Sequence, residues 1–239
     1  MIEGNIVDVW VYLSASPLTG LTLTLVSYLS AYFLYQKFSH NSFLNPVLIA
    51  VVLIILLLWI TGTTYLDYFE GAQFVHFLLG PATVALAVPL YSNLPQLRTI
   101  WLPATVAIIS GAIIASLSAM GIAWVLGAEP ESVLSLAPKS VTAPVAMGIS
   151  EKIGGLPSLT AVLVVLTGVL GAVFGIKVFR ICRITDDAIT GIAMGVTSHG
   201  IGTARAFQVS EQMGAFSGLA MALSAFGTAL LIPLLVSLV

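Results

Sequence analysis

The chain has 239 residues, of which 59% are hydrophobic and only 8% are charged, whereas soluble domains carry about 25% charged residues. Its several apolar runs reach the roughly 20 residues needed to cross a bilayer core, which predicts an all-α, polytopic integral membrane protein. The net charge of −2 excludes nucleic-acid binding through a basic face. The apolar segments leave no room for a soluble catalytic domain, so a single membrane domain over residues 1–239 is expected.

The predicted elements begin with a short amphipathic lead at 4–16, followed by apolar segments. The N-terminal residues 1–8 carry Glu3 and Asp8 but no Lys or Arg, unlike a signal or transit peptide, so a multi-pass protein of a bacterial inner (plasma) membrane is expected. Five segments are typical of membrane helices and three are interrupted, which predicts seven or eight membrane segments. The segments lie at 18–36, 43–61, 71–92, 100–126, 131–150, 156–180, 187–207 and 214–238.

Prolines and glycines interrupt three segments, around 80–89, 137–148 and 195–206. Such breaks persist in a membrane only where protein covers them or where they line a cavity, because lipid cannot bond the freed backbone groups. Half-helix ends also attract ions and anionic groups. We therefore expect the three breaks to converge on one site. The residues that break the helices are Gly80, Pro81, Pro89, Pro138, Pro144, Gly200 and Gly202.

A weak internal repeat accompanies these breaks. The sequence from Pro81 to Val84 resembles that from Pro138 to Val141. Each is followed by a segment that opens Leu-Pro and ends Gly-Ile, at 102–122 and at 156–176. Repeated pairs of broken and unbroken helices are typical of transporters, although the sequence leaves open whether the two repeats run parallel or inverted.

The charges also predict topology, with the N-terminus outside and the basic loops at Lys37 and Arg98 in the cytoplasm. If every segment crossed once, the basic stretch 177–183 would fall outside. The simplest solution is that one interrupted segment, 131–150, is re-entrant.

Two cations lie within the broken segments, and they are candidates for binding an anionic substrate. Lys139 is flanked by prolines and hydroxyl residues. Arg205 follows a glycine-rich stretch, and its guanidinium could bind a carboxylate with two hydrogen bonds. The alternative for both is a cation near a helix end whose side chain extends to the lipid headgroups. The hydroxyl residues expected to assist in substrate binding are Ser140, Thr142, Thr83, Ser198 and Thr203.

His199 and Glu211 are candidates for proton coupling, since an imidazole titrates near neutral pH; a structural histidine and a solvated interfacial glutamate are the alternatives. The pair Gly200 and Gly202 lacks the strand, third glycine and acidic residue of a dinucleotide site. Nucleophile and metal-ligand spacings are also lacking, so no enzymatic activity, cofactor or metal is expected. Glycine pairs at 171/175 and 191/195 allow close helix packing, within the subunit or in a homo-oligomer.

Four ordered motifs resemble the LrgB/CidB family over essentially the whole chain. They are Asn45-Pro46, the stretch 79–91, Pro138-Lys139-Ser140-Val141-Thr142, and 199–205 together with Glu211 and 214–221. The resemblance implies a small LrgA/CidA-like membrane partner and one of two roles. Bacterial members are described as antiholin-like regulators of murein hydrolase activity and lysis. Plastid relatives exchange glycolate and glycerate, and some bacterial pairs are linked to pyruvate uptake.

Buried cations at broken helices suit a small carboxylate better than they suit a protein that only holds a pore shut. The sequence therefore favours a transporter or facilitator of small monocarboxylates such as glycolate, glycerate, lactate or pyruvate. An antiholin-like regulator without transport activity is the alternative.

Overall fold

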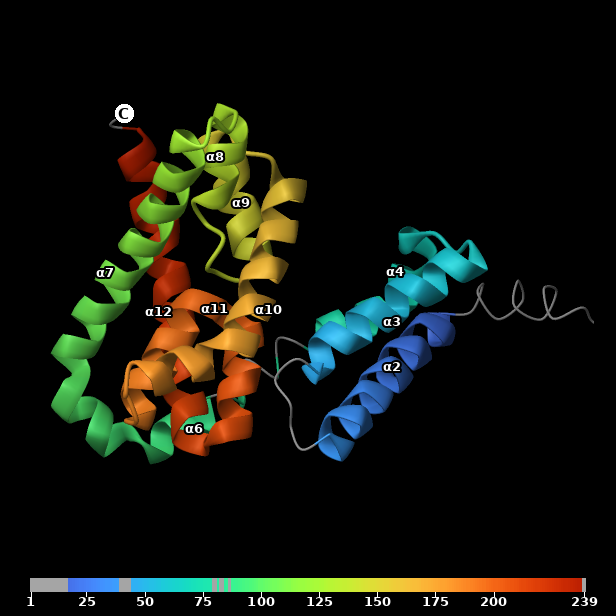
Figure 1. Cartoon of the computed structure of the whole chain (residues 1–239), viewed down its shortest axis with the longest axis horizontal. Helices are drawn as coiled ribbons and strands as arrows, with labels where there is room; N and C mark the ends of the chain where they lie inside the picture. Colours follow the sequence, from blue (N-terminus) through green and yellow to red (C-terminus); the bar gives the residue numbers. More distant parts are fainter. Residues whose placement is uncertain (1–16, 39–43, 79–80, 82–83, 86, 238–239) are drawn as a thin grey trace, which may run out of the picture. The chain divides into compact units, whose positions relative to one another are not determined.

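The computed structural model describes residues 17–38, 44–78, 81, 84–85 and 87–237. The chain divides into two compact units, residues 1–85 and 86–239, and each is described by itself (Figure 1). All regular secondary structure in the described part is helical. The predicted lead at 4–16 lies outside the described residues, as do Gly80 and Thr83 of the first predicted break.

The first unit contains three described helices, α2 (Pro17–Lys37), α3 (Pro46–Thr61) and α4 (Tyr65–Phe77). α2 packs against both α3 and α4, and the hydroxyls of Thr24 and Tyr68 lie 2.7 Å apart across one of these contacts. Asn45 Oδ1 accepts hydrogen bonds from the backbone N–H groups of Val47 and Leu48, so this residue caps α3.

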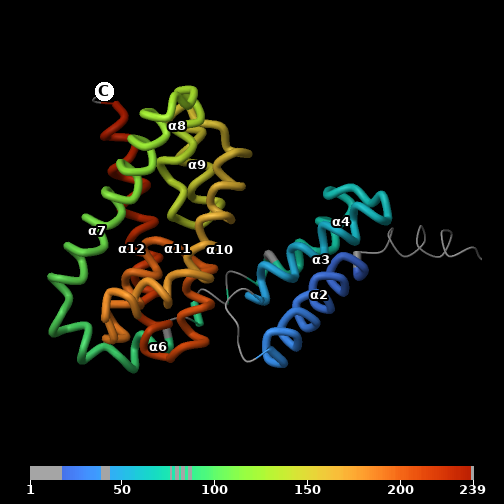
Figure 2. The backbone as a smooth tube through the Cα atoms, in the orientation of Figure 1, coloured from blue at the N-terminus to red at the C-terminus, as the bar shows by residue number. Residues whose placement is uncertain are grey.

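The second unit contains seven described helices, which Figure 2 traces as a smooth tube. They are α6 (Ala87–Ser92), α7 (Leu94–Val125), α8 (Pro130–Leu136), α9 (Ala143–Ile153), α10 (Pro157–Ile181), α11 (Asp187–Val209) and α12 (Glu211–Val236).

Four helices among the described residues are long and apolar enough to cross a bilayer, namely α2, α7, α10 and α12, and α3 is a shorter apolar helix. Together with the composition, these helices define an α-helical membrane protein. The exact count of seven or eight segments and the internal repeat stay predictions.

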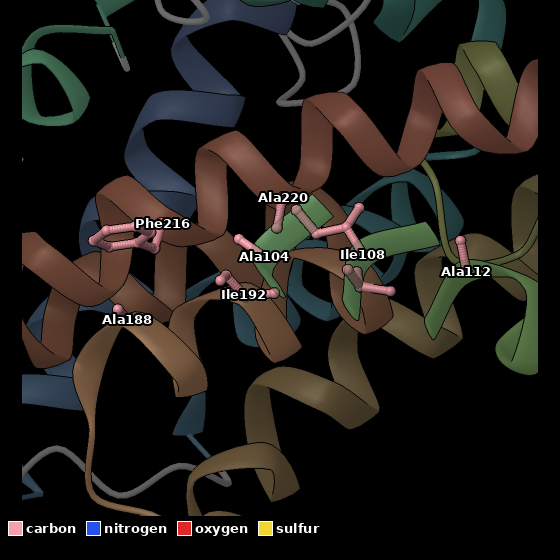
Figure 3. Packing of buried hydrophobic residues seen from close by; sticks show 8 residues of the cluster. Ala104, Ile108, Ala112, Ala188, Ile192, Phe216 and Ala220 are labelled. Atoms are coloured by element: carbon pink, nitrogen blue, oxygen red, sulfur yellow. The ribbon is translucent and has the colours of Figure 1, made fainter. Parts of the chain in front are cut away.

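Small side chains bring α7, α11 and α12 together in one core (Figure 3). α7 contributes Ala104, Ile108 and Ala112, and they meet Ile192 of α11 and Phe216 of α12. Alanines at these contacts let helix backbones approach closely, which is how helices associate where lipid competes for apolar surface. This core holds α11 against two candidate membrane helices.

The segment 130–156 folds back on itself, and we call it hairpin 1. Its two arms, α8 and α9, are joined by a turn at residues 137–142. The N–H of Leu156, just after α9, donates to Ser135 Oγ near the end of α8 over 2.7 Å. Thr160 Oγ1 of α10 lies 3.0 Å from the Ser135 carbonyl oxygen and 2.7 Å from Ser150 Oγ. These bonds close the base of the hairpin, so hairpin 1 starts and finishes at the same end of the second unit.

The segment 187–210 also folds back, and we call it hairpin 2. The helical path of α11 is broken at His199, whose φ is 40° and ψ is −135°. A Cβ placed on Gly202 would lie 3.1 Å from the carbonyl oxygen of Met194, so the two arms lie side by side. At the base, Ser210 Oγ donates to Asp187 Oδ2 over 2.6 Å. Residues 187–198 therefore form a first arm and residues 200–209 a returning second arm.

If 130–153 is a re-entrant hairpin, its two ends lie on the same side of the membrane, whereas the ends of a spanning segment lie on opposite sides. Cysteines introduced at the exposed positions Glu129 and Lys152 should react with a membrane-impermeant thiol reagent from the same side of the membrane. The native exposed Cys182, beyond the far end of α10, should react only from the other side. Because Cys182 would obscure the signal, the two single cysteines are made in a Cys182→Ser background. Labelling of positions 129 and 152 from opposite sides would show that 130–153 spans the membrane.

Candidate functional site

The tips of the two hairpins meet at the middle of α10. Hairpin 1 starts and ends where α10 begins, and hairpin 2 starts just beyond the end of α10, so the hairpins insert from opposite ends of this helix. From hairpin 1, Ala137 and Val141 share a buried cluster with Val164 of α10. From hairpin 2, the imidazole Nε2 of His199 lies 2.9 Å from the Val164 carbonyl oxygen. Both breaks therefore flank one turn of α10.

Glycines on α10 let hairpin 2 approach this closely. A Cβ on Gly168 would lie 2.7 Å from the His199 ring, and one on Gly175 would lie 2.6 Å from Met194 Sδ. A Cβ on Gly171, between them, would overlap Ser198 Oγ. As the residue numbers rise along α10, those of the contacted residues fall along α11. The first arm of hairpin 2 is therefore antiparallel to α10.

Two helix N-termini begin at the tips. α9 starts at Ala143 after Thr142, whose side chain makes no capping hydrogen bond, and the second arm of hairpin 2 starts at Gly200. The first N–H groups of a helix have no partner within the helix and carry partial positive charge, so they favour an anion. The sequence predicted such half-helix ends; the structure adds that both returning arms begin at the centre.

Lys139 lies in the turn of hairpin 1. Its side chain is half-buried, and its Nζ donates to Ser140 Oγ over 3.2 Å. Its positive charge is close enough to act electrostatically on His199. From residue 86 onward, acidic residues occur only at positions 129, 131, 151, 186, 187 and 211, and all are exposed except the half-buried Asp187 at the base of hairpin 2. The described interior of this unit therefore holds no carboxylate that could neutralise Lys139.

His199 is buried, and its hydrogen bond fixes its tautomer. A backbone carbonyl can only accept, so Nε2 must carry the hydrogen that it donates to Val164. Nδ1 of the neutral ring is then free to accept a hydrogen or a proton. The positive φ of His199 is costly for a residue with a Cβ, and such strain is typically retained at functional positions.

Hydroxyls surround the tip of hairpin 2. Thr203 Oγ1 donates to the His199 carbonyl oxygen over 2.8 Å, and Ser217 Oγ of α12 lies 2.8 Å from the same Thr203 oxygen. Ser198 is also buried, and its Oγ lies 3.1 Å from that of Thr197. Of the predicted binding residues, the structure thus brings Lys139 and Ser140 toward Ser198 and Thr203, and the proton-coupling candidate His199 lies with them.

The remaining candidates lie away from the tips. Arg205 is on the second arm of hairpin 2, between tip and base, and its Nη1 donates to Gln208 over 2.9 Å. Glu211 is exposed in the first turn of α12, at the base of this hairpin. Pro89 lies within α6, and Pro81 lies in the first unit, so the first predicted break falls at the boundary between the two units.

The structure also places the breaks residue by residue. Pro138 lies in the turn of hairpin 1 and Pro144 in the first turn of α9. In hairpin 2 the chain reverses at His199, one residue before Gly200, while Gly202 is helical and allows the two arms to pack closely.

Residues that the sequence analysis did not single out complete the centre. Ser116 of α7 donates to the Ala137 carbonyl oxygen over 2.6 Å, which satisfies a backbone group freed at the break of hairpin 1. On α12, Ser217, Ser224 and Thr228 are all buried. Their spacing of seven and four residues places them on one helix face, and this spacing was the only signal available in the sequence.

The fold and this centre define a class of protein: a polytopic α-helical membrane protein in which two hairpins of opposite insertion meet around a half-buried cation. Residues 24–238 match the model of the LrgB-like family, and the chain belongs to this family.

Its relatives cover nearly the same length. The chain is 37% identical to the uncharacterized protein YwbG of Bacillus subtilis (strain 168), over 92% of this chain and 97% of that protein. It is 32% identical to the holin-like protein CidB of Staphylococcus aureus (strain N315), over 90% of this chain and 94% of that one. It is 35% identical to the uncharacterized protein YxaC of Bacillus subtilis (strain 168), over 85% of this chain and 88% of that one. No solved structure matches the chain significantly.

Proposed function

We propose that the protein is a transporter or facilitator of small organic monocarboxylates of the glycolate, glycerate, lactate or pyruvate type. One observation carries the proposal: Lys139 has no carboxylate near it in the described interior of its unit, and two helix N-termini begin beside it. A half-buried ammonium without a counter-ion is costly at membrane depth. A bound carboxylate removes that cost, and it accepts hydrogen bonds from the free N–H groups at the same time.

On this proposal the other groups have separate tasks. Ser140, Thr142, Ser198 and Thr203 offer hydroxyls at the two tips, and Arg205 lies on the second arm of hairpin 2. For proton coupling, His199 is better placed than Glu211, because Nδ1 of its ring is at the centre and Glu211 is at the hairpin base. On this proposal, the hairpins act in a bacterial inner membrane with a small LrgA/CidA-like partner.

Uptake into proteoliposomes tests the proposal directly. The purified protein, with and without the small partner subunit, should give saturable uptake of labelled glycolate that exceeds that of protein-free vesicles. Unlabelled glycolate and pyruvate should compete, and glycolamide, which has the same size but no charge, should not compete. Absence of carboxylate flux under both conditions would reject transport.

A second candidate is an antiholin-like or holin-like regulatory subunit without transport activity. The name of the staphylococcal relative supports it, as does an apolar groove of about 480 Å³ between α7 and α11, which could accept a helix of a partner. This candidate predicts no solute flux, and a lysis phenotype that is indifferent to replacement of Lys139 and Arg205.

A further inference from the structure

Ser224 of α12 has a hydroxyl that the fold does not use. The residue is 1% exposed, and its Oγ has no hydrogen-bond partner among the described residues. Leaving a buried hydroxyl without a partner is costly, because its hydrogen bonds to water are lost and not replaced. By contrast, the buried hydroxyls of Thr203 and Ser217 bond each other, and that of Ser116 donates to the Ala137 carbonyl oxygen.

The contacts of α12 show which way Ser224 points. Ala220 faces the first arm of hairpin 2, since its Cβ would lie 2.9 Å from a Cβ on Gly195. Met221 faces the second arm, with its Sδ 4.0 Å from Thr203 Oγ1 and 3.9 Å from a Cβ on Gly200. Ser224 follows Ala220 by four residues and Met221 by three, so it continues the same face one turn further along. Gly200 is already at the tip, so Ser224 lies one turn of α12 beyond the contacts with this tip.

Hairpin 1 packs against the adjoining face of α12. Ala225 and Ala229, on the adjoining face of α12, pack against the cluster that contains Ala137 and Val141 from the turn of hairpin 1. Ser224 therefore lies between the tip of hairpin 2 and the turn that carries Lys139.

We propose that Ser224 binds the oxygen on carbon 2 of the substrate, so that the protein selects 2-hydroxy or 2-oxo monocarboxylates over unsubstituted ones; this inference rests on the proposed transport function. Lys139 and the helix N-termini take the carboxylate, which every small monocarboxylate has. The adjacent carbon then carries the only group by which glycolate differs from acetate. A serine hydroxyl both donates and accepts, so it can bond a hydroxyl or a keto oxygen.

Matched ligand pairs test this assignment on the full-length protein. Binding is measured as the shift in melting temperature and as Kd, with glycolate against acetate and lactate against propionate. The wild type should bind the 2-hydroxy acid of each pair about five to ten times more tightly, the value of one hydrogen bond. Ser224→Ala should bring the ratio close to one and leave acetate binding unchanged.

The stability of the empty protein separates this role from a structural one. Ser224→Ala removes an unsatisfied group, so its melting temperature should equal or exceed that of the wild type. Ser217→Ala is the matched control, since it breaks the bond to Thr203 and should melt lower.

Three results would overturn the assignment while leaving carboxylate transport intact: equal binding of acetate and glycolate by the wild type, an unchanged ratio in Ser224→Ala, or a lower melting temperature for this variant. Failure of the wild type to bind any of the four acids would instead overturn the proposed function, and the role of Ser224 with it.

Discussion

Lys139→Gln should weaken glycolate binding about a hundredfold, a loss of about 3 kcal/mol. The substitution keeps a side chain of similar reach but removes the charge that pairs with the carboxylate. It also removes a half-buried ammonium with no carboxylate beside it in the described interior of the unit. The empty variant should therefore melt at the same temperature as the wild type or higher. Titration calorimetry and thermal melting in detergent measure the two effects.

Two further variants show whether the effect belongs to the site. Lys152→Gln removes an exposed lysine from the last turn of α9, and it should leave glycolate binding unchanged. Lys139→Arg keeps the positive charge but places it on a planar guanidinium group, so it should retain part of the affinity for glycolate. A Lys139→Gln protein that binds glycolate like the wild type would mean that the lysine extends to the headgroups, which is the alternative that the sequence left open.

Gly195→Ala should lower the free energy of unfolding by about 3 kcal/mol, the upper range for overpacking a close contact. A Cβ at this position would overlap the carbonyl oxygen of Ser217. That oxygen belongs to the backbone of α12, so it cannot rotate away, and hairpin 2 must separate from α12. The melting temperature in detergent should therefore fall by several degrees.

Gly121→Ala in α7 is the control for this prediction. Among the described residues, no atom outside the neighbouring backbone of α7 itself lies within 4 Å of a Cβ placed there. Alanine favours a helix by up to about 1 kcal/mol over glycine, so this variant should be as stable as the wild type or more stable. If Gly195→Ala has the same melting temperature as Gly121→Ala, the packing of hairpin 2 on α12 is looser than described.

The sequence predicted the class of fold and two of the centre's breaks for a clear physical reason. Prolines at 138 and 144 and glycines around His199 are costly in membrane helices, so their clustering marks where the helices stop. Charge asymmetry similarly indicated a re-entrant 131–150, because positive residues accumulate on one side. Such signals are local, and they can be read from short stretches of residues.

The parts that could not be predicted depend on long-range contacts. Closure of hairpin 2 needs the bond between Ser210 and Asp187, which are 23 residues apart, so 187–207 was expected to cross the membrane as one interrupted segment. Ser224 gave no signal of its own, because a serine in an apolar helix usually bonds its own backbone. Its position beyond the tip of hairpin 2 and the lack of a partner for its hydroxyl among the described residues distinguish it from the other serines of α12.

The opposite insertion of the two hairpins has a consequence for energetics. On the proposed transport function, each hairpin separates the centre from one face of the bilayer. A carrier that uses no other source of energy works in both directions, so the sign of net flux is set by the concentrations of solute and coupling ion on either side. The same molecule would then export an acid that accumulates inside the cell and recover that acid once it is scarce.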